Sequence, residues 1–419
     1  MLKCLQVPEN SPKIRNINGV RVCFEEEFRI GEGADGTSVY IGLSEDGYER
    51  AVKRLLKNVS GKLGLQEKKI LNTLNAVDSK CILRYWFYDQ ESDPAFAYLI
   101  LDLCEETLEQ YVKDQSQEKL VKNAPFIIRQ ILDALSDLHC KPEPVLHRDL
   151  KPSNIMRSVN DKWLLADFGL SRMLPEGQTT HQSVEKGTKF WRAVESYPTK
   201  DKGDSDSKVR FKKRSDIQAA GMVAYHVLTK GEHAFGPERD RLANLLDGKP
   251  VGLNSLKDPV AKELISWMLE NKPEDRPYAH EALQHPYLLP PDKQFELLKC
   301  VGNEQEIKNT KTSSDVAKKI NADPLLPNSG WISCIDINVL RHVCGSHLYP
   351  NQWAQSLRFI RNTSVHWNDT VKPAAVQNVV GEPQDYFLKL FPTLPAVVHR
   401  IIRNDRDWKG KGTLKKFFG

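Results

Sequence analysis

The sequence lacks any long run of apolar residues. In its 419 residues, no stretch approaches the roughly 18 or more apolar residues that a membrane-spanning helix requires. The first segment, MLKCLQVPENSPKIRN, also lacks the continuous apolar region of a secretory signal peptide. We therefore predict a cytoplasmic protein with no membrane insertion by this chain.

Cysteine clusters, internal repeats and a strong net charge are also missing. The eight cysteines are scattered without a C-x-x-C pair, which argues against a zinc site, so we interpret them as reduced and mostly structural. A formal charge of +5 is too small to indicate nucleic-acid binding by the whole molecule. The charge is uneven, because 18 Lys and Arg stand against 12 Asp and Glu from Pro291 onward.

What remains is typical of a globular protein. With 40% hydrophobic and 27% charged residues, a chain of this length predicts two or three domains. A strand pattern runs from Val20 to Leu43. Apolar residues then recur at helical spacing over three stretches, 122–138, 217–228 and 260–269. Prolines at positions 286, 290 and 291 interrupt the helical pattern and indicate a domain boundary.

A glycine-rich loop lies inside the strand pattern, with the G-x-G-x-x-G spacing of Gly31, Gly33 and Gly36. A dinucleotide fold would place a helix directly after it, whereas the strand-like SVYIGL follows here and the chain continues to Lys53. Glycines let backbone N–H groups approach phosphate oxygens, and a lysine can bind the same phosphates. Glu67 is the candidate ion-pair partner of Lys53, although these two residues alone are equally compatible with unrelated surface charges.

Two further motifs, VLHRDLKPSNIM and ADFG, make the sequence similar to the protein kinases. The resemblance implies an α+β fold, with an antiparallel sheet in the N-lobe and a helical C-lobe. It also implies that Asp149 accepts the proton of the attacking hydroxyl and that Lys151 neutralises the transferred phosphoryl group. Asn154 and Asp167 would hold Mg²⁺, and the nucleotide would be ATP or ADP.

The same resemblance extends through the rest of this domain. Asp102 and Cys104, in LILDLCEETLEQY, would offer backbone groups to the adenine. Arg276 and Glu195 would form a buried ion pair. Kinases mostly have Ala-Pro-Glu where this chain has Val194 between Ala and Glu, so the shape of the substrate-docking segment is an open question.

The loop between the ADFG motif and Glu195 contains several hydroxyl side chains. Phosphorylation of one of them would order the loop through an arginine, with Arg148 as the natural partner; alternatively, they are ordinary polar loop residues. The candidates are Ser171, Thr179, Thr180, Ser183 and Thr188.

About 130 residues follow the kinase-like part. Three segments, LLKCVGNEQEIK, LYPNQWAQSLRFIRNTSVHW and DYFLKLFPTLPAVVHRII, resemble the kinase-extension nuclease (KEN) domain. This all-α domain occurs in the oligoadenylate-dependent ribonuclease RNase L and in the sensor kinase/endoribonucleases of the unfolded-protein response. We therefore expect an N-terminal tail over 1–21, a kinase domain over 22–288 and a KEN endoribonuclease domain over 289–419.

Metal-independent RNA cleavage by 2′-hydroxyl attack needs a base, an acid and a cation at the phosphate. Arg361 and His366 lie within about one and a half helical turns of each other. The resemblance assigns His366 as general acid, Tyr349 as general base or proton partner, and Arg361 and Asn362 as phosphate-binding and orienting groups. Gln355 stands where the families have an aspartate that positions the arginine, so the efficiency of cleavage is an open question.

Other residues near the four predicted nuclease residues have two interpretations. Trp353 and Trp367 would either stack on an unpaired base or pack in the core. The segment 400–416, with seven Lys and Arg against two Asp, would either steer RNA or form a solvated face.

Taken together, the motifs predict a dual serine/threonine protein kinase and endoribonuclease that acts on stem-loop or single-stranded RNA. By resemblance, nucleotide binding would favour a homodimer that assembles the RNA site, and the protein substrate would include the chain itself through autophosphorylation. The alternatives are a kinase with a non-catalytic adaptor extension and a nucleotide-sensing scaffold without phosphoryl transfer. Only about 20 residues precede the kinase strands, so the chain is a fragment or receives its activating signal from a partner protein.

Overall fold

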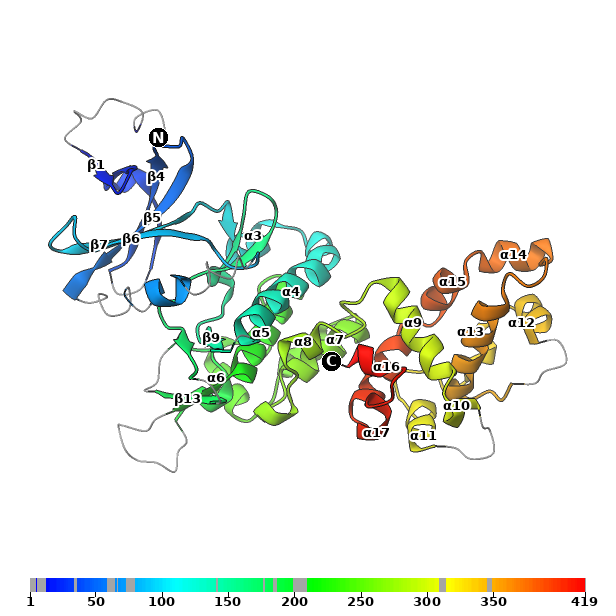
Figure 1. Cartoon of the computed structure of the whole chain (residues 1–419). Helices are drawn as coiled ribbons and strands as arrows, with labels where there is room; N and C mark the ends of the chain where they lie inside the picture. The colour runs from blue at the N-terminus through cyan, green and yellow to red at the C-terminus, as the bar shows by residue number, and fades with distance from the viewer. Residues whose placement is uncertain are drawn as a thin grey trace. The chain divides into compact units, whose positions relative to one another are not determined.

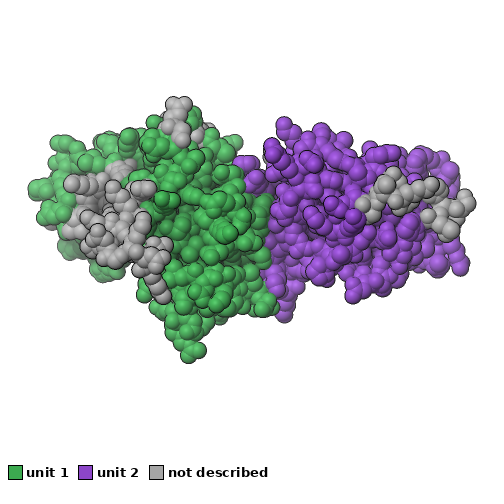
Figure 2. Space-filling view, turned by 90° about the horizontal axis from the view of Figure 1, so that it is seen from below, with its two compact units in different colours: residues 1–255, 265–279 green, residues 256–264, 280–419 purple. Residues whose placement is uncertain are grey.

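A computed structural model divides the chain into two compact units, coloured separately in Figure 2. The first comprises residues 1–255 with 265–279, and the second comprises 256–264 with 280–419. Every helix in the described part of the chain is too short or too polar to span a membrane. The structure describes residues 5, 13–33, 36–58, 65, 67–72, 80–140, 142–175, 178–183, 187–198, 209–308, 314–344 and 349–418.

The first unit begins with a seven-stranded antiparallel sheet, which lies at the blue end of the chain in Figure 1. The strand order is β1-β2-β4-β5-β7-β6, with β3 paired to β4. Residues 14–21, expected in the N-terminal tail, are largely strand, and β2 pairs with β4. The strands are β1 (Ile14–Ile17), β2 (Val20–Cys23), β3 (Arg29–Glu32), β4 (Ser38–Ser44), β5 (Glu49–Leu56), β6 (Tyr85–Asp89) and β7 (Phe96–Asp102).

Strand β5 shows how the sheet positions a functional side chain. Val52 lies between Tyr40 of β4 and Ile100 of β7, and all three are buried in the core of the sheet. Because successive residues of a strand face opposite sides, the next residue, Lys53, leaves this core and enters the site described below.

The rest of the first unit is mainly helical. Helices α4 and α5 pack side by side (Figure 1). The buried apolar residues of α4 recur at the predicted helical spacing, whereas α5 is buried on nearly all sides. The helices are α3 (Leu108–Asp114), α4 (Gln117–His139), α5 (Lys213–Leu228), α6 (Glu238–Leu246) and the end of α7 (Pro259–Met268), whose residues 259–264 belong to the second unit. Short strands connect them: β8 (Glu106–Thr107), β9 (Val145–Leu146), β10 (Ile155–Arg157), β11 (Trp163–Leu165), β12 (Arg172–Met173), β13 (Thr180–Ser183) and β14 (Val209–Lys212).

The second unit is helical, and its central pair is α9 and α13, which lie side by side (Figure 1). The close approach requires glycine at 302, since a Cβ there would lie 2.1 Å from the carbonyl oxygen of Leu357. Its remaining helices follow α8 (Ala279–Ala282): α9 (Pro291–Gly302), α10 (Gln305–Lys308), α11 (Asp315–Asn321), α12 (Ile337–Cys344), α13 (Trp353–His366), α14 (Ala374–Val380), α15 (Pro383–Leu390), α16 (Leu394–Arg403) and α17 (Arg406–Lys409).

A buried ion-pair cluster lies within the second unit, between its part of α7 and its C-terminal helices. Glu263 accepts hydrogen bonds from Arg403 Nη1 and Nη2, at 3.1 and 2.7 Å, and pairs with His285. Burial alone would raise the pKa of Glu263, but His285 and Arg403 outweigh it and hold that pKa well below its usual range. Removing one member of such a cluster would leave an uncompensated buried charge, so these contacts stabilise the unit as a whole.

Candidate functional site

Three charged residues meet on the inner side of the N-terminal sheet. Lys53 Nζ lies 3.1 and 3.0 Å from the two carboxylate oxygens of Glu67, and 2.9 Å from Asp167 Oδ1. Glu67 belongs to the helical stretch 67–72, and Asp167 follows β11. The structure thus brings together the predicted pair of Lys53 and Glu67 and the aspartate of ADFG. Lys53 and Asp167 are 114 positions apart in the sequence.

The charge states of this cluster follow from its contacts. Burial would lower the pKa of Lys53, but the carboxylates of Asp167 and Glu67 outweigh it, so the net shift is upward. The nearby Lys53 cation outweighs burial for Asp167 and lowers its pKa. Burial raises the pKa of Glu67 despite Lys53. Lys53 is therefore a cation and Asp167 an anion at neutral pH, as phosphate and metal binding require.

The segment around Asp149 forms a dense polar network. Asp149 Oδ1 accepts hydrogen bonds from the amide and the hydroxyl of Thr188, both at 2.8 Å. Asp149 Oδ2 lies 3.0 Å from both Asn154 Nδ2 and Lys151 Nζ. Lys151 Nζ also donates to the Thr188 hydroxyl at 2.6 Å. Thr188 was predicted only as one of five loop hydroxyls, because its sequence position gives no sign of these contacts.

Helix α5 holds this loop in place through Asp216. The buried Asp216 carboxylate accepts hydrogen bonds from the amides of His147 and Arg148 and contacts His139 Nε2, each at 2.9 Å. Burial would raise the pKa of Asp216, but the contact with His139 contributes most to lowering it. The three contacts stabilise Arg148 in a left-handed backbone conformation, with φ of 69°.

The environment of the loop hydroxyls differs from one to the next. Ser171 is fully buried and donates to the carbonyl of His147, and Thr188 contacts Asp149 as described above. Thr179 is exposed and Thr180 is half-buried, whereas the side chain of Ser183 lies outside the described residues. Fewer hydroxyls of this loop are therefore accessible for phosphorylation than the sequence of the loop contains.

The predicted glycine loop connects β3 to β4, and the predicted hinge begins at the end of β7. The amide of Asp102 donates to the carbonyl of Arg84 at 3.1 Å, so this amide is already used within the fold. Burial, aided by Asp102, raises the pKa of the half-buried Cys104 thiol to about 12. In the glycine loop, Gly31 lies in β3, and the amide of Gly33 donates to the Thr37 carbonyl at 2.9 Å. The third glycine, Gly36, has a φ of 72°, which favours glycine.

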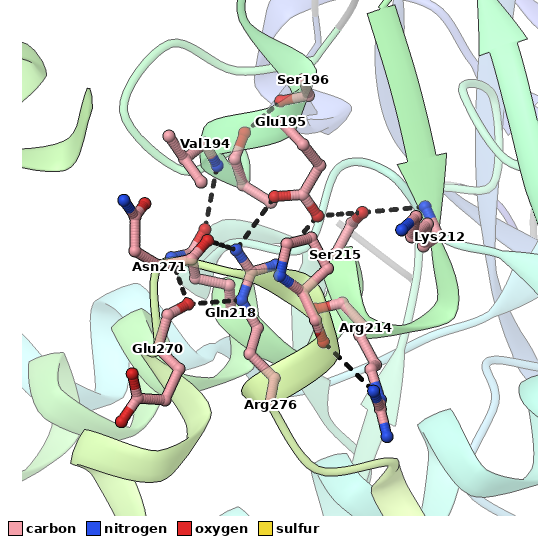
Figure 3. A network of polar contacts seen from close by, with 12 residues as sticks. Val194, Glu195, Ser196, Lys212, Arg214, Ser215, Gln218, Glu270, Asn271 and Arg276 are labelled. Atoms are coloured by element: carbon pink, nitrogen blue, oxygen red, sulfur yellow. Dashed lines mark hydrogen bonds and ion pairs between the residues drawn. The ribbon is translucent and has the colours of Figure 1, made fainter. Parts of the chain in front are cut away.

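The predicted pair of Glu195 and Arg276 is present in a larger network (Figure 3), in which Arg276 is buried and Glu195 is half-buried. Arg276 donates to both Glu195 oxygens at 2.9 Å and to three backbone carbonyls. The amide of Val194 donates to Gln218 Oε1 at 2.9 Å, also visible in Figure 3. A proline has no N–H to make that contact, so valine suits the local structure of this chain.

Val194→Pro, which introduces the usual kinase residue, is therefore expected to destabilise this protein by about 1–2 kcal/mol, since buried Gln218 would lose its donor. Thermal and urea unfolding of the full chain would measure the change. Val194→Ala, which keeps the amide, is the matched control. Equal stability of the two variants would contradict the importance of this hydrogen bond.

In the second unit, three of the four predicted nuclease residues form a chain of hydrogen bonds. Arg361 Nη1 donates to Asn362 Oδ1 at 2.9 Å, and Asn362 Nδ2 donates to the Tyr349 hydroxyl oxygen at 2.8 Å. Because a guanidinium can only donate, it orients the Asn362 amide with its nitrogen toward Tyr349. The Tyr349 oxygen consequently accepts this hydrogen bond, which holds it next to Asn362.

The fourth residue, His366, is the last residue of α13 and lies four positions after Asn362, on the same helix face. Its Nδ1 atom lies 2.7 Å from Asp369 Oδ2. Asp369 was not among the predicted site residues. A carboxylate three residues after the histidine was the only available signal, and such spacing is common on protein surfaces.

Gln355 does not contact the arginine in the way the family aspartate was expected to. The side chain is buried, and its Nε2 donates to the carbonyl of Ile307 in α10 at 2.9 Å. No donor among the described residues reaches its Oε1 atom. An amide at this position therefore supports the packing of α13 on α10.

Gln355→Asp, which restores the family residue, is expected to destabilise the protein by about 3 kcal/mol, because a carboxylate cannot donate to Ile307 and would be buried without a partner. Urea unfolding would measure this cost. Gln355→Leu removes the donor without adding charge and should cost less. An aspartate variant that is as stable as the wild type and cleaves RNA faster would show that the carboxylate reaches Arg361.

The structure also separates the alternatives for the tryptophans and the basic segment. Trp353 and Trp367 are only 4% and 6% exposed, so both pack in the core. Four of the seven basic residues in 400–416 form ion pairs within the second unit, which leaves fewer charges to attract RNA. The pairs are Arg400–Asp323, Arg403–Glu263, Lys411–Glu304 and Lys416–Glu296.

Comparison with known proteins was made with this geometry in hand. Residues 24–288 match the protein kinase domain, and residues 294–418 match the Ribonuclease 2-5A domain. The chain is 30% identical to human serine/threonine-protein kinase/endoribonuclease IRE2, over 95% of this chain and 43% of the relative. It is 27% identical to serine/threonine-protein kinase/endoribonuclease ire-1 of Caenorhabditis elegans, over 99% of this chain and 42% of the relative.

A third relative is the sensor for unfolded proteins in the ER, ire1, of Schizosaccharomyces pombe, with 28% identity over 90% of this chain and 37% of the relative. The chain thus spans less than half the length of these relatives. Protein kinase domains in general use a nucleotide and Mg²⁺. The predicted bilobal α+β fold followed by a helical domain is confirmed, and the chain belongs to the protein kinase family, with a ribonuclease 2-5A domain following its kinase domain.

Proposed function

We propose that the chain is a serine/threonine protein kinase and a metal-independent endoribonuclease. The observation that carries the proposal is that both predicted sets of polar residues form networks with chemically suitable partners. Lys53, Glu67 and Asp167 are in contact in the first unit, and Tyr349, Asn362 and Arg361 are in contact in the second. The names of the relatives support the same pair of activities.

In the kinase site, Asp149 accepts the proton of the substrate hydroxyl, and Lys151 neutralises the transferred phosphoryl group. Lys53 binds the nucleotide phosphates under the glycine loop, and Glu67 holds it in position. The amide of Cys104 donates to the adenine, because that of Asp102 is used by Arg84, which leaves Asp102 its carbonyl oxygen.

The residues proposed to hold the metal ion fit Mg²⁺, which prefers carboxylate and amide oxygens. Asp167 supplies an ionised carboxylate. Asn154 makes two hydrogen bonds to Asp149 through its amide nitrogen, so its oxygen end is the metal-binding end. When bound there, Mg²⁺ neutralises charge on the nucleotide phosphates.

In the nuclease site, the RNA 2′-oxygen attacks the adjacent phosphorus, forming the O2′–P bond while the P–O5′ bond breaks. The proton of the 2′-hydroxyl passes to the Tyr349 oxygen, which Asn362 orients, while the proton that this oxygen already carries leaves to solvent. Nε2 of protonated His366 donates a proton to the departing 5′-oxygen. Arg361 stabilises the negative charge that develops on the phosphate. The products are a 2′,3′-cyclic phosphate and a 5′-hydroxyl, with no metal ion taking part in these steps.

Regulation of the nuclease forms the second part of the proposal. By family resemblance, ATP or ADP in the kinase site favours a homodimer that assembles the RNA site. In this proposal the chain autophosphorylates the loop after Asp167, and Arg148 binds the added phosphate. Arg148 suits this role because it is only 5% exposed and no described acceptor reaches its guanidinium nitrogens. A phosphate on this loop would supply the missing partner.

Two assays on the full chain test the proposed activities. A labelled stem-loop RNA in EDTA should be cut to cyclic-phosphate ends, faster with ADP and at protein concentrations where sedimentation detects a dimer. With Mg²⁺ and labelled ATP, the chain should incorporate phosphate. Intact RNA at dimer-forming concentrations would favour a kinase with an adaptor extension, and absent phosphate incorporation would favour a nucleotide-sensing scaffold.

A further inference from the structure

We propose that Asp369 is a positioning residue for RNA cleavage, acting through His366 by fixing which ring nitrogen carries the transferable proton. This inference rests on the proposed nuclease function and adds a residue to its machinery. The observation behind it is the contact of 2.7 Å between His366 Nδ1 and Asp369 Oδ2.

The local backbone brings the two side chains together. Helix α13 ends at His366, and the amide of Asp369 donates to the carbonyl of His366 at 3.3 Å, which closes a turn. Trp367, between them, is buried in the core of the unit and anchors this turn. The side chains of His366 and Asp369 are each 60% exposed, so the pair remains accessible to a large substrate.

The identity of the bonded atom matters for the chemistry. An ionised carboxylate only accepts hydrogen bonds, so His366 must donate through Nδ1–H. The other ring nitrogen, Nε2, is then the atom that exchanges a proton with the substrate. Nε2–H of the imidazolium gives its proton to the 5′-oxygen as the P–O5′ bond breaks, and the neutral ring keeps its proton on Nδ1. Without the carboxylate, the ring can rotate and adopt the other tautomer, which lowers the fraction of productive encounters.

The first test measures cleavage of the labelled stem-loop RNA by variants of the full chain. Asp369→Ala should lower kcat by about 10-fold with little change in KM, because an exposed orienting contact accounts for only part of the rate provided by general acid catalysis. Asp369→Glu should restore most of the lost rate. The matched control is Asp315→Asn, which removes an exposed carboxylate from a similar i,i+3 pair with Lys318.

Two further readouts separate positioning from a general structural effect. In a His366→Ala background, Asp369→Ala should cause no additional loss, since a residue that acts through His366 has nothing left to orient. The ¹⁵N chemical shifts of His366 at high pH should indicate the Nδ1–H tautomer in the wild type and a shift toward Nε2–H in Asp369→Ala.

The outcomes distinguish this inference from the proposed nuclease function. If the wild type itself fails to cleave RNA, the nuclease function is wrong, and an unchanged ¹⁵N tautomer in Asp369→Ala would then also overturn the positioning role. If the wild type cleaves RNA but Asp369→Ala retains its rate, or loses it equally in the His366→Ala background, Asp369 does not act through His366.

Discussion

Asp167→Asn should reduce phosphate incorporation by about 1,000-fold or more. The substitution removes the carboxylate that contacts Lys53 and that we propose to hold Mg²⁺, so charge on the transferred phosphoryl group is no longer neutralised. Asparagine is the conservative choice because Asp167 has a φ of 62°, a conformation that asparagine tolerates better than most residues. Incorporation from labelled ATP in the presence of Mg²⁺ would measure the effect.

The control for this experiment is Asp240→Asn, which changes a half-exposed aspartate on α6 that pairs with the adjacent Arg239. It should keep full kinase activity. Thermal unfolding of both variants would check that the fold is intact. Phosphate incorporation by Asp167→Asn within about threefold of the wild type would contradict the assigned role of Asp167.

His366→Ala should reduce RNA cleavage by about 100- to 10,000-fold, the range expected for loss of a general acid. The leaving 5′-oxygen would depart without a proton, while Arg361 could still bind the phosphate, so kcat should fall more than binding. Because the His366 side chain is 60% exposed, the free energy of unfolding of the variant should lie within about 0.5 kcal/mol of the wild-type value. Cleavage in EDTA, followed at saturating RNA, is the measurement.

His342→Ala, which changes an exposed histidine near the end of α12 in the same unit, is the matched control. It should cleave RNA at the wild-type rate. Equal loss in both histidine variants would indicate a general effect on RNA binding instead of proton transfer. Cleavage by His366→Ala at the wild-type rate would show that His366 is not the general acid.

Much of the kinase part was predictable from sequence because its motifs combine two local signals. The apolar residues next to Lys53 favour a strand, which is β5, and Gly36 before it takes a positive φ that few other residues adopt. The helical spacing over 122–138 corresponds to the buried face of α4. These patterns depend on near neighbours in the chain, which a sequence displays directly.

The contacts of Thr188, Val194 and Gln355 could not be predicted in the same way. Thr188 meets Asp149 across 39 positions, and Gln355 meets Ile307 across 48. Val194 donates to Gln218, which is 24 positions away. Each of these hydrogen bonds depends on how separate elements pack, so the sequence suggested a loop hydroxyl and two departures from a pattern, but not their partners.

The sequence by itself determined the order of the elements, the two families and the residues proposed for catalysis, because motif spacing and periodicity are properties of the local chain. Only the tertiary structure decided that Trp353 and Trp367 are buried and that the basic segment is largely ion-paired. It also placed Asp369 against His366. The physical reason is that burial and ion pairing arise from contacts between distant segments, whose free energies depend on the packed environment and not on residue type alone.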